Sequence, residues 1–262
     1  MEPQVKLRAV QLVEALGSWR PGQQGISAAR RRVSALGLPP DLAGQAGPLL
    51  APADEATVQV VDAQYGGILA DTASVLVVCR QWIRREGVVT AGGTTVDVRL
   101  SRARPRWTVT ALHPARPGAA ASSLPVAARR VLDDARIQLP PAARADVRSG
   151  HIHVGVLEAM LHLAEKYRMY VSVIRSGHPL YVFGTSRPSD HPKGRAFDVW
   201  QIDGRAVVDP STPRSLLASF MRDAATGGSY NVGGPVQLSG GAPGQYFSDA
   251  THHDHIHLGY RI

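Results

Sequence analysis

The chain has 262 residues, 44% apolar and 19% charged, so it can bury a core, and a wholly disordered protein is excluded. The net charge is +8, and the excess lies in residues 1–150, with 19 Lys and Arg against 12 Asp and Glu. No apolar run reaches about 18 residues, so no membrane span is expected. The single cysteine, Cys79, rules out an intrachain disulfide and is expected to be a small buried residue.

The first part of the chain predicts a small α+β domain. Apolar spacing predicts a helix over residues 4–17, and Ser27 is a candidate N-cap for a second helix to about Leu36. Residues 38–56 are rich in Pro, Gly and Ala and predict a loop, while Gly92-Gly93 predicts a turn before a strand. Runs rich in Val and Thr predict strands over residues 57–63, 73–83, 94–100 and 107–112.

Residues 114–123, small and helix-breaking, predict a linker between domains 1–118 and 119–262. In the second domain a Gly-rich loop is expected over residues 226–245. The order of elements predicts an α+β fold in which helices pack on a small antiparallel sheet. Helices are expected over residues 126–137, 154–167 and 213–225, and strands over residues 170–175, 195–201, 206–209 and 254–261.

Two separated segments carry the strongest chemical signal. The first runs from Ser189 to Asp198 and the second is His252-His253-Asp254-His255-Ile256-His257. Alternation along the predicted strands directs Asp198 to one face of the first strand, and His255 and His257 to one face of the last. His191 lies in the loop before Asp198. Together these residues predict a catalytic Zn²⁺ site with His191, Asp198 and His257 as ligands.

Such a site suits hydrolysis of an amide, because zinc lowers the pKa of a bound water to about 7. Hydrolysis also needs a base for the water and a cation for the developing oxyanion. His255 is the candidate for the first role. Arg175, at the end of the strand leading into the motif loop, is the candidate for the second, with Arg187 and Arg195 nearby.

The pattern Ser-x-His-x-x-Gly-x-Ala-x-Asp, followed downstream by His-x-His, resembles that of the zinc D-alanyl-D-alanine carboxypeptidase and murein endopeptidase group. That group includes lysostaphin-type and Hedgehog-like domains, and the resemblance covers about residues 124–262. It implies a Hedgehog-like fold and one zinc ion held by His191, Asp198 and His257. It also implies that His255 assists catalysis and that Arg175 stabilises the transition state. Nothing about residues 1–118 follows from it.

Several other residues near the motifs have two readings. Ser189 is expected to support a ligand by hydrogen bonding. His252 is either a solvated loop residue or a residue that lines the site, as in some murein endopeptidases, and Trp200 is either a core residue or a substrate contact. His151 and His153 lack a nearby carboxylate and are expected at the surface.

The function predicted is zinc-dependent hydrolysis of peptide bonds in peptidoglycan stems or cross-bridges, by a carboxypeptidase or an endopeptidase on D,D or L,D bonds. The alternative is a non-catalytic metal-containing component that binds the cell wall or belongs to a phage-like or injection apparatus. Residues 1–118 could dock to an anionic wall polymer or a protein, and no nucleic-acid fingerprint accompanies the basic charge. The N-terminal residues lack a signal-peptide layout, so we expect release by a non-standard route or removal of a leader.

Overall fold

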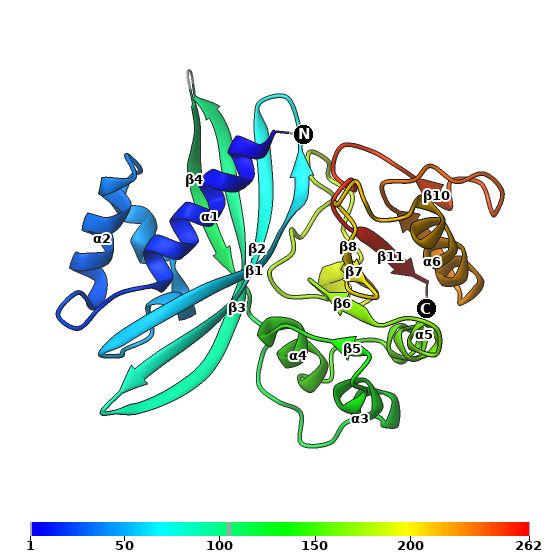
Figure 1. The fold of residues 1–262 in the computed structure, drawn as a ribbon, viewed down its shortest axis with the longest axis horizontal. Helices are drawn as coiled ribbons and strands as arrows, with labels where there is room; N and C mark the ends of the chain where they lie inside the picture. Colours follow the sequence, from blue (N-terminus) through cyan, green and yellow to red (C-terminus); the bar gives the residue numbers. More distant parts are fainter. Residues whose placement is uncertain (1, 104–105, 262) are drawn as a thin grey trace. The chain divides into compact units, whose positions relative to one another are not determined.

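A computed structural model describes residues 2–103 and 106–261. The chain divides into two compact units, Met1–Arg116 and Pro117–Ile262. The division falls within residues 114–123, where the sequence analysis places a linker. Both units combine helices with a sheet, so the fold is α+β (Figure 1).

The first unit contains a four-stranded antiparallel meander in the order β1-β2-β3-β4. Helix α1 packs on its strands through a buried stripe spaced as a helix requires, which includes Val5, Leu12 and Leu16 (Figure 1). The strands contribute Val75, Val77 and other alternate residues to the same core. The elements are α1 (Pro3–Gly17), α2 (Gly25–Ala35), the 3₁₀ turns η1 (Pro40–Gln45) and η2 (Gly47–Leu50), β1 (Glu55–Ile68), β2 (Thr72–Arg85), β3 (Val88–Ala103) and β4 (Arg106–Pro114).

Three local predictions for this unit are wrong. Helix α2 begins two residues before Ser27, with Gln24 at its N-cap position and no side-chain cap, so Ser27 lies inside the helix. Gly92-Gly93 lies within β3, where the two glycines pair with Gln81 and Arg80 of β2 instead of forming a turn. The 38–56 segment forms two 3₁₀ turns before β1 begins. For Gly92-Gly93, pairing with β2 outweighs the local preference of the glycines for a turn.

The second unit has a sheet in the order β10-β9-β11-β7-β6-β5, with β8 paired to β7. It is mixed and not purely antiparallel as expected, because β5–β6 and β9–β10 are parallel pairs. The elements are α3 (Val126–Asp133), β5 (Ile137–Gln138), α4 (Pro141–Arg148), α5 (Val154–Ala164), β6 (Met169–Val171), η3 (His191–Lys193), β7 (Ala196–Ile202), β8 (Arg205–Ala206), α6 (Arg214–Thr226), β9 (Ser229–Gly233), β10 (Tyr246–Phe247) and β11 (Ile256–Tyr260).

The helices of this unit share one core with the strands. Phe197 and Val199 of β7 and Ile256 and Leu258 of β11 belong to the same buried cluster as residues of α3, α4, α5 and α6. Because side chains alternate along a strand, Asp198 of β7 and His257 of β11 point to the other face. The core therefore orients the polar residues of both motifs away from the helices.

Sequence patterning missed α4 and β9 in this unit, as well as the two-residue strands β5 and β10. Helix α4 starts at Pro141, where no helix was expected, and α3 ends at Asp133, before the expected end at Ile137. Strand β9 lies inside the expected Gly-rich loop and pairs with both β10 and β11. Within the described parts of the chain, no helix is long and apolar enough to cross a membrane.

Candidate metal centre

The two motifs meet through strand pairing. In the antiparallel register of β7 and β11, His257 lies directly opposite Asp198. Opposite residues on one face of a sheet have Cβ atoms about 5 Å apart, so pairing alone brings the carboxylate and the imidazole together. The His257 Nδ1 atom lies 3.0 Å from Asp198 Oδ1.

His191 enters from the short 3₁₀ turn η3 that precedes β7. Its Nδ1 atom lies 2.8 Å from the Ile174 carbonyl oxygen, which can only accept, so Nδ1 carries the proton. A neutral ring then presents its lone pair at Nε2, which lies 3.2 Å from Asp198 Oδ1 and 3.1 Å from His257 Nδ1. The side chains of His191 and Asp198 are almost completely buried.

The turn that carries His191 depends on Gly194. This residue has φ +69°, in the left-handed region, and a Cβ there would lie 2.1 Å from the His151 carbonyl oxygen. The Gly194 carbonyl accepts a hydrogen bond from the His153 N–H, 3.0 Å away. The glycine of the first motif therefore lets the loop approach the chain just before α5.

His191 Nε2, Asp198 Oδ1 and His257 Nδ1 form a cluster of acceptors that needs a cation or protons at its centre. Their separations of 3.0–3.2 Å are close to the spacing of about 3.4 Å that tetrahedral zinc ligands adopt at 2.0–2.2 Å from the ion. Burial acts to raise the pKa of Asp198, but His191 and His255 outweigh it and hold that pKa well below its usual value. Burial lowers the pKa of His257 to about 4, so this imidazole is neutral near pH 7.

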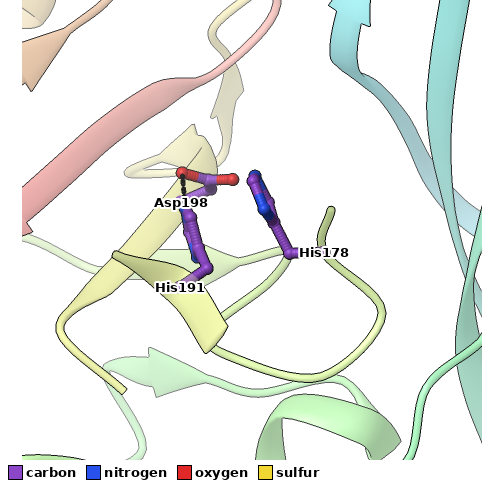
Figure 2. A group of neighbouring side chains, drawn as sticks. All are labelled: His178, His191 and Asp198. Atoms are coloured by element: carbon purple, nitrogen blue, oxygen red, sulfur yellow. Dashed lines mark ion pairs between the residues drawn. The ribbon is translucent and has the colours of Figure 1, made fainter. Parts of the chain in front are cut away.

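His178, which belongs to neither sequence motif, lies beside this cluster. Its ring stacks on that of His191, with centroids 3.9 Å apart and planes inclined by 16°. Ligand atoms of His178, His191 and Asp198 lie within 4.8 Å of one another and could hold a metal ion (Figure 2). The only available signal was a histidine three residues after Arg175, in a loop without periodicity.

His255 lies just before β11 and is oriented by its neighbour. Its Nδ1 atom lies 2.7 Å from Asp254 Oδ1, and both side chains are buried. Its Nε2 atom lies 3.9 Å from Asp198 Oδ2, at the edge of the cluster. The Asp254 carboxylate was also missed, although it stands next to His255 in the sequence. It fixes the tautomer of this ring.

His252 lies close to the other imidazoles of the second motif. Its ring centroid is 5.1 Å from that of His255 and 5.7 Å from that of His257. Its Nδ1 lies 2.7 Å from Asp249 Oδ1, and it meets the Phe247 ring edge to face. Burial acts to raise the pKa of Asp249, but its hydrogen bonds with His252 outweigh that effect and lower it to about 2.

The other predicted site residues occupy different positions. The Ser189 Oγ accepts from the His191 backbone N–H at 3.3 Å and lies 3.4 Å from His178 Nδ1. The Arg175 Nη1 atom lies 3.3 Å from Pro117 O and 3.9 Å from Asp146 Oδ1. Trp200 is half-buried and meets the Tyr170 ring edge to face.

A buried carboxylate supports the segment that orients His191. Asp146 of α4 accepts hydrogen bonds at Oδ2 from the backbone N–H groups of Arg175, at 3.1 Å, and Ser176, at 2.8 Å. The preceding residue, Ile174, supplies the carbonyl that fixes the His191 ring. Burial raises the pKa of Asp146 despite these bonds.

A second contact holds the motif loop against β9. The Tyr230 hydroxyl donates to Asp190 Oδ2 at 2.5 Å, and the Arg261 guanidinium lies 4.6 Å from the Tyr230 ring centroid. Burial raises the pKa of Tyr230 to about 12, so the hydroxyl keeps its proton at neutral pH.

The donor set of imidazoles and one carboxylate suits a borderline cation such as Zn²⁺ and contains no thiolate. No known protein family, curated protein or solved structure matches the chain.

Proposed function

We propose that the protein is a zinc-dependent peptidase that hydrolyses peptide bonds of bacterial peptidoglycan. The observation that carries this proposal is the convergence of His191 Nε2, Asp198 Oδ1 and His257 Nδ1 within 3.0–3.2 Å. A third imidazole, that of His255, lies beside them and is paired with Asp254. The resemblance of the motifs to those of murein peptidases supplies the substrate class. The proposal covers carboxypeptidase and endopeptidase action, on D,D or L,D bonds.

A zinc ion held by these residues would polarise the scissile carbonyl and make a water molecule nucleophilic near neutral pH. The residues of the protein orient the ligand atoms and hold or transfer the protons. His191 keeps its proton on Nδ1 through the Ile174 carbonyl, so its Nε2 lone pair stays directed at the site. Asp198 stays ionised because of the imidazoles around it.

His255 is the proposed general base. Asp254 holds the proton on Nδ1, so Nε2 is the atom that can accept a proton from the attacking water. The resulting imidazolium would be stabilised by Asp254 and could return the proton to the leaving amine. His252, ordered by Asp249, lies near enough to contact a substrate bound at His255.

Arg175 is proposed to stabilise the oxyanion. Its backbone is anchored by Asp146, and its side chain is 25% exposed, so the guanidinium is within reach of solvent. In the structure the guanidinium donates a hydrogen bond to the Pro117 carbonyl, and Arg175 would have to break this bond in order to bind an oxyanion.

The test is digestion of purified peptidoglycan by the zinc-loaded full chain, followed by mass spectrometry of the muropeptides. Wild type is expected to release new amino groups, and His255→Ala to lower the rate by about 100-fold or more. His253→Ala is the matched control, because His253 is the exposed neighbour in the same segment. Wild type that binds zinc and wall material but releases no amino groups from any wall preparation would refute the enzyme proposal and support the non-catalytic alternative.

A further inference from the structure

The His178 imidazole is placed like a metal ligand. It stacks nearly parallel to His191, and Figure 2 shows one of its ring nitrogens facing the Asp198 carboxylate. Its ligand atom lies within 4.8 Å of those of His191 and Asp198. This limit is wider than the 3.0–3.2 Å spacing among His191, Asp198 and His257, so the His178 side chain would have to move closer to reach an ion at that centre.

The tautomer of His178 also suits coordination. Its Nδ1 atom lies 3.0 Å from the Pro179 carbonyl oxygen, which can only accept, so this nitrogen carries the proton and Nε2 holds the lone pair. His191 has the same arrangement with the Ile174 carbonyl. A backbone carbonyl that fixes one nitrogen of an imidazole and leaves the other for the metal is the usual outer support of a ligating histidine.

We propose that His178 is a fourth protein ligand of the ion held by His191, Asp198 and His257. The inference shares its metal site with the proposed function and adds a regulatory consequence. Four protein ligands close a zinc site, whereas catalysis needs an open position for water or substrate. The conformation described is then a resting one, and hydrolysis requires His178 to leave.

The loop that carries His178 is built to move as a piece. Two of its backbone hydrogen bonds are internal, from Val182 N to Arg187 O at 2.8 Å and from Ser189 N to Leu180 O at 3.0 Å. Leu180 and Tyr181 at its tip are 68% and 53% exposed, so the tip buries little apolar surface, whereas Pro179, next to His178, is buried. Gly177, next to His178, has φ +81° and can absorb a change of backbone direction.

The experiment compares metal binding by full-length wild type and His178→Ala, without any substrate. Zinc affinity is measured by competition with a chromophoric chelator, and the ligand sphere by the visible spectrum of the Co²⁺-loaded protein. His178→Ala is expected to bind zinc at least about tenfold more weakly and to shift the cobalt spectrum, and added imidazole is expected to restore that spectrum. His253→Ala is the control and is expected to match wild type.

Unchanged zinc affinity and an unchanged cobalt spectrum in His178→Ala would overturn the inference. His178→Gln, which keeps a similar side-chain length, and the melting temperature of the metal-free proteins separate loss of a ligand from loss of folding. These readings are independent of hydrolysis. An inactive wild type with weaker metal binding in His178→Ala would refute only the proposed function, whereas an active wild type with unchanged binding would refute only this inference.

Discussion

Replacing Gly194 by alanine should disrupt the metal centre although residue 194 is not a ligand. Gly194 has φ +69°, and adopting this left-handed conformation costs an alanine about 1–2 kcal/mol. The added Cβ would also lie 2.1 Å from the His151 carbonyl oxygen and 3.2 Å from Ile152 Cα. Both are backbone atoms next to α5, so neither can rotate away.

Gly204→Ala is a matched control for the strain alone. Gly204 has φ +78°, and nothing lies within 4 Å of a Cβ placed there. We expect Gly204→Ala to lower the free energy of unfolding by about 1–2 kcal/mol and to leave zinc affinity unchanged. Gly194→Ala is expected to lose more than this, about 3 kcal/mol or more, because the clash adds to the strain.

Urea unfolding of the metal-free proteins measures the stability term, and chelator competition measures zinc affinity. Because His191 lies three residues before Gly194, the shifted turn should also weaken zinc binding by about tenfold or more. Equal stability losses in the two variants, together with wild-type zinc affinity in Gly194→Ala, would refute the steric argument.

Three further predictions concern supporting groups. Asp254→Asn should lower the hydrolytic rate constant by about tenfold or more and leave zinc affinity at the wild-type value, because the carboxylate orients His255, which is not one of the proposed metal ligands. An equal loss of zinc affinity would contradict this. Asp146 has a raised pKa when folded, so the folded state holds its proton more tightly and this group adds stability as the pH falls. Urea unfolding of wild type and Asp146→Asn should therefore show wild type gaining stability relative to the variant as the pH falls from neutral towards the ordinary Asp pKa of about 4, and the opposite trend would contradict the raised pKa. Burial raises the pKa of Cys79 to about 11, and its Sγ lies 3.3 Å from the Thr94 carbonyl oxygen. A thiol reagent at pH 8 should therefore label native protein far more slowly than protein in denaturant, and equal rates would contradict the burial of Cys79.

Strand periodicity allowed part of the candidate site to be predicted. Asp198 and His257 lie in strands with apolar residues on alternate positions, and this alternation indicated correctly that they point away from the core. They face each other only because β7 pairs with β11, since Asp198 and His257 are 59 residues apart in the sequence. The motif spacing suggested that His191 joins them, but the atom that it presents depends on the Ile174 carbonyl.

Other features depended on contacts that a linear pattern does not contain. His178 lies in a loop without periodicity, and only the fold places its ring against that of His191. Strand β9 lies in a Gly-rich segment whose local propensity does not favour a strand. Its pairing with β10 and β11 holds it in the sheet, and the sequence pattern does not contain that pairing.

The sequence by itself determined the α+β class, the two motifs and the imidazole and carboxylate side chains of the candidate metal centre, because periodicity and side-chain chemistry are local properties. Only the tertiary structure decided which imidazole nitrogens face the carboxylate, which carbonyls and carboxylates orient them, and that His178 lies beside the centre. The physical reason is that a metal centre depends on distances of about 3 Å between atoms far apart in the chain, and only strand register and loop packing set those distances.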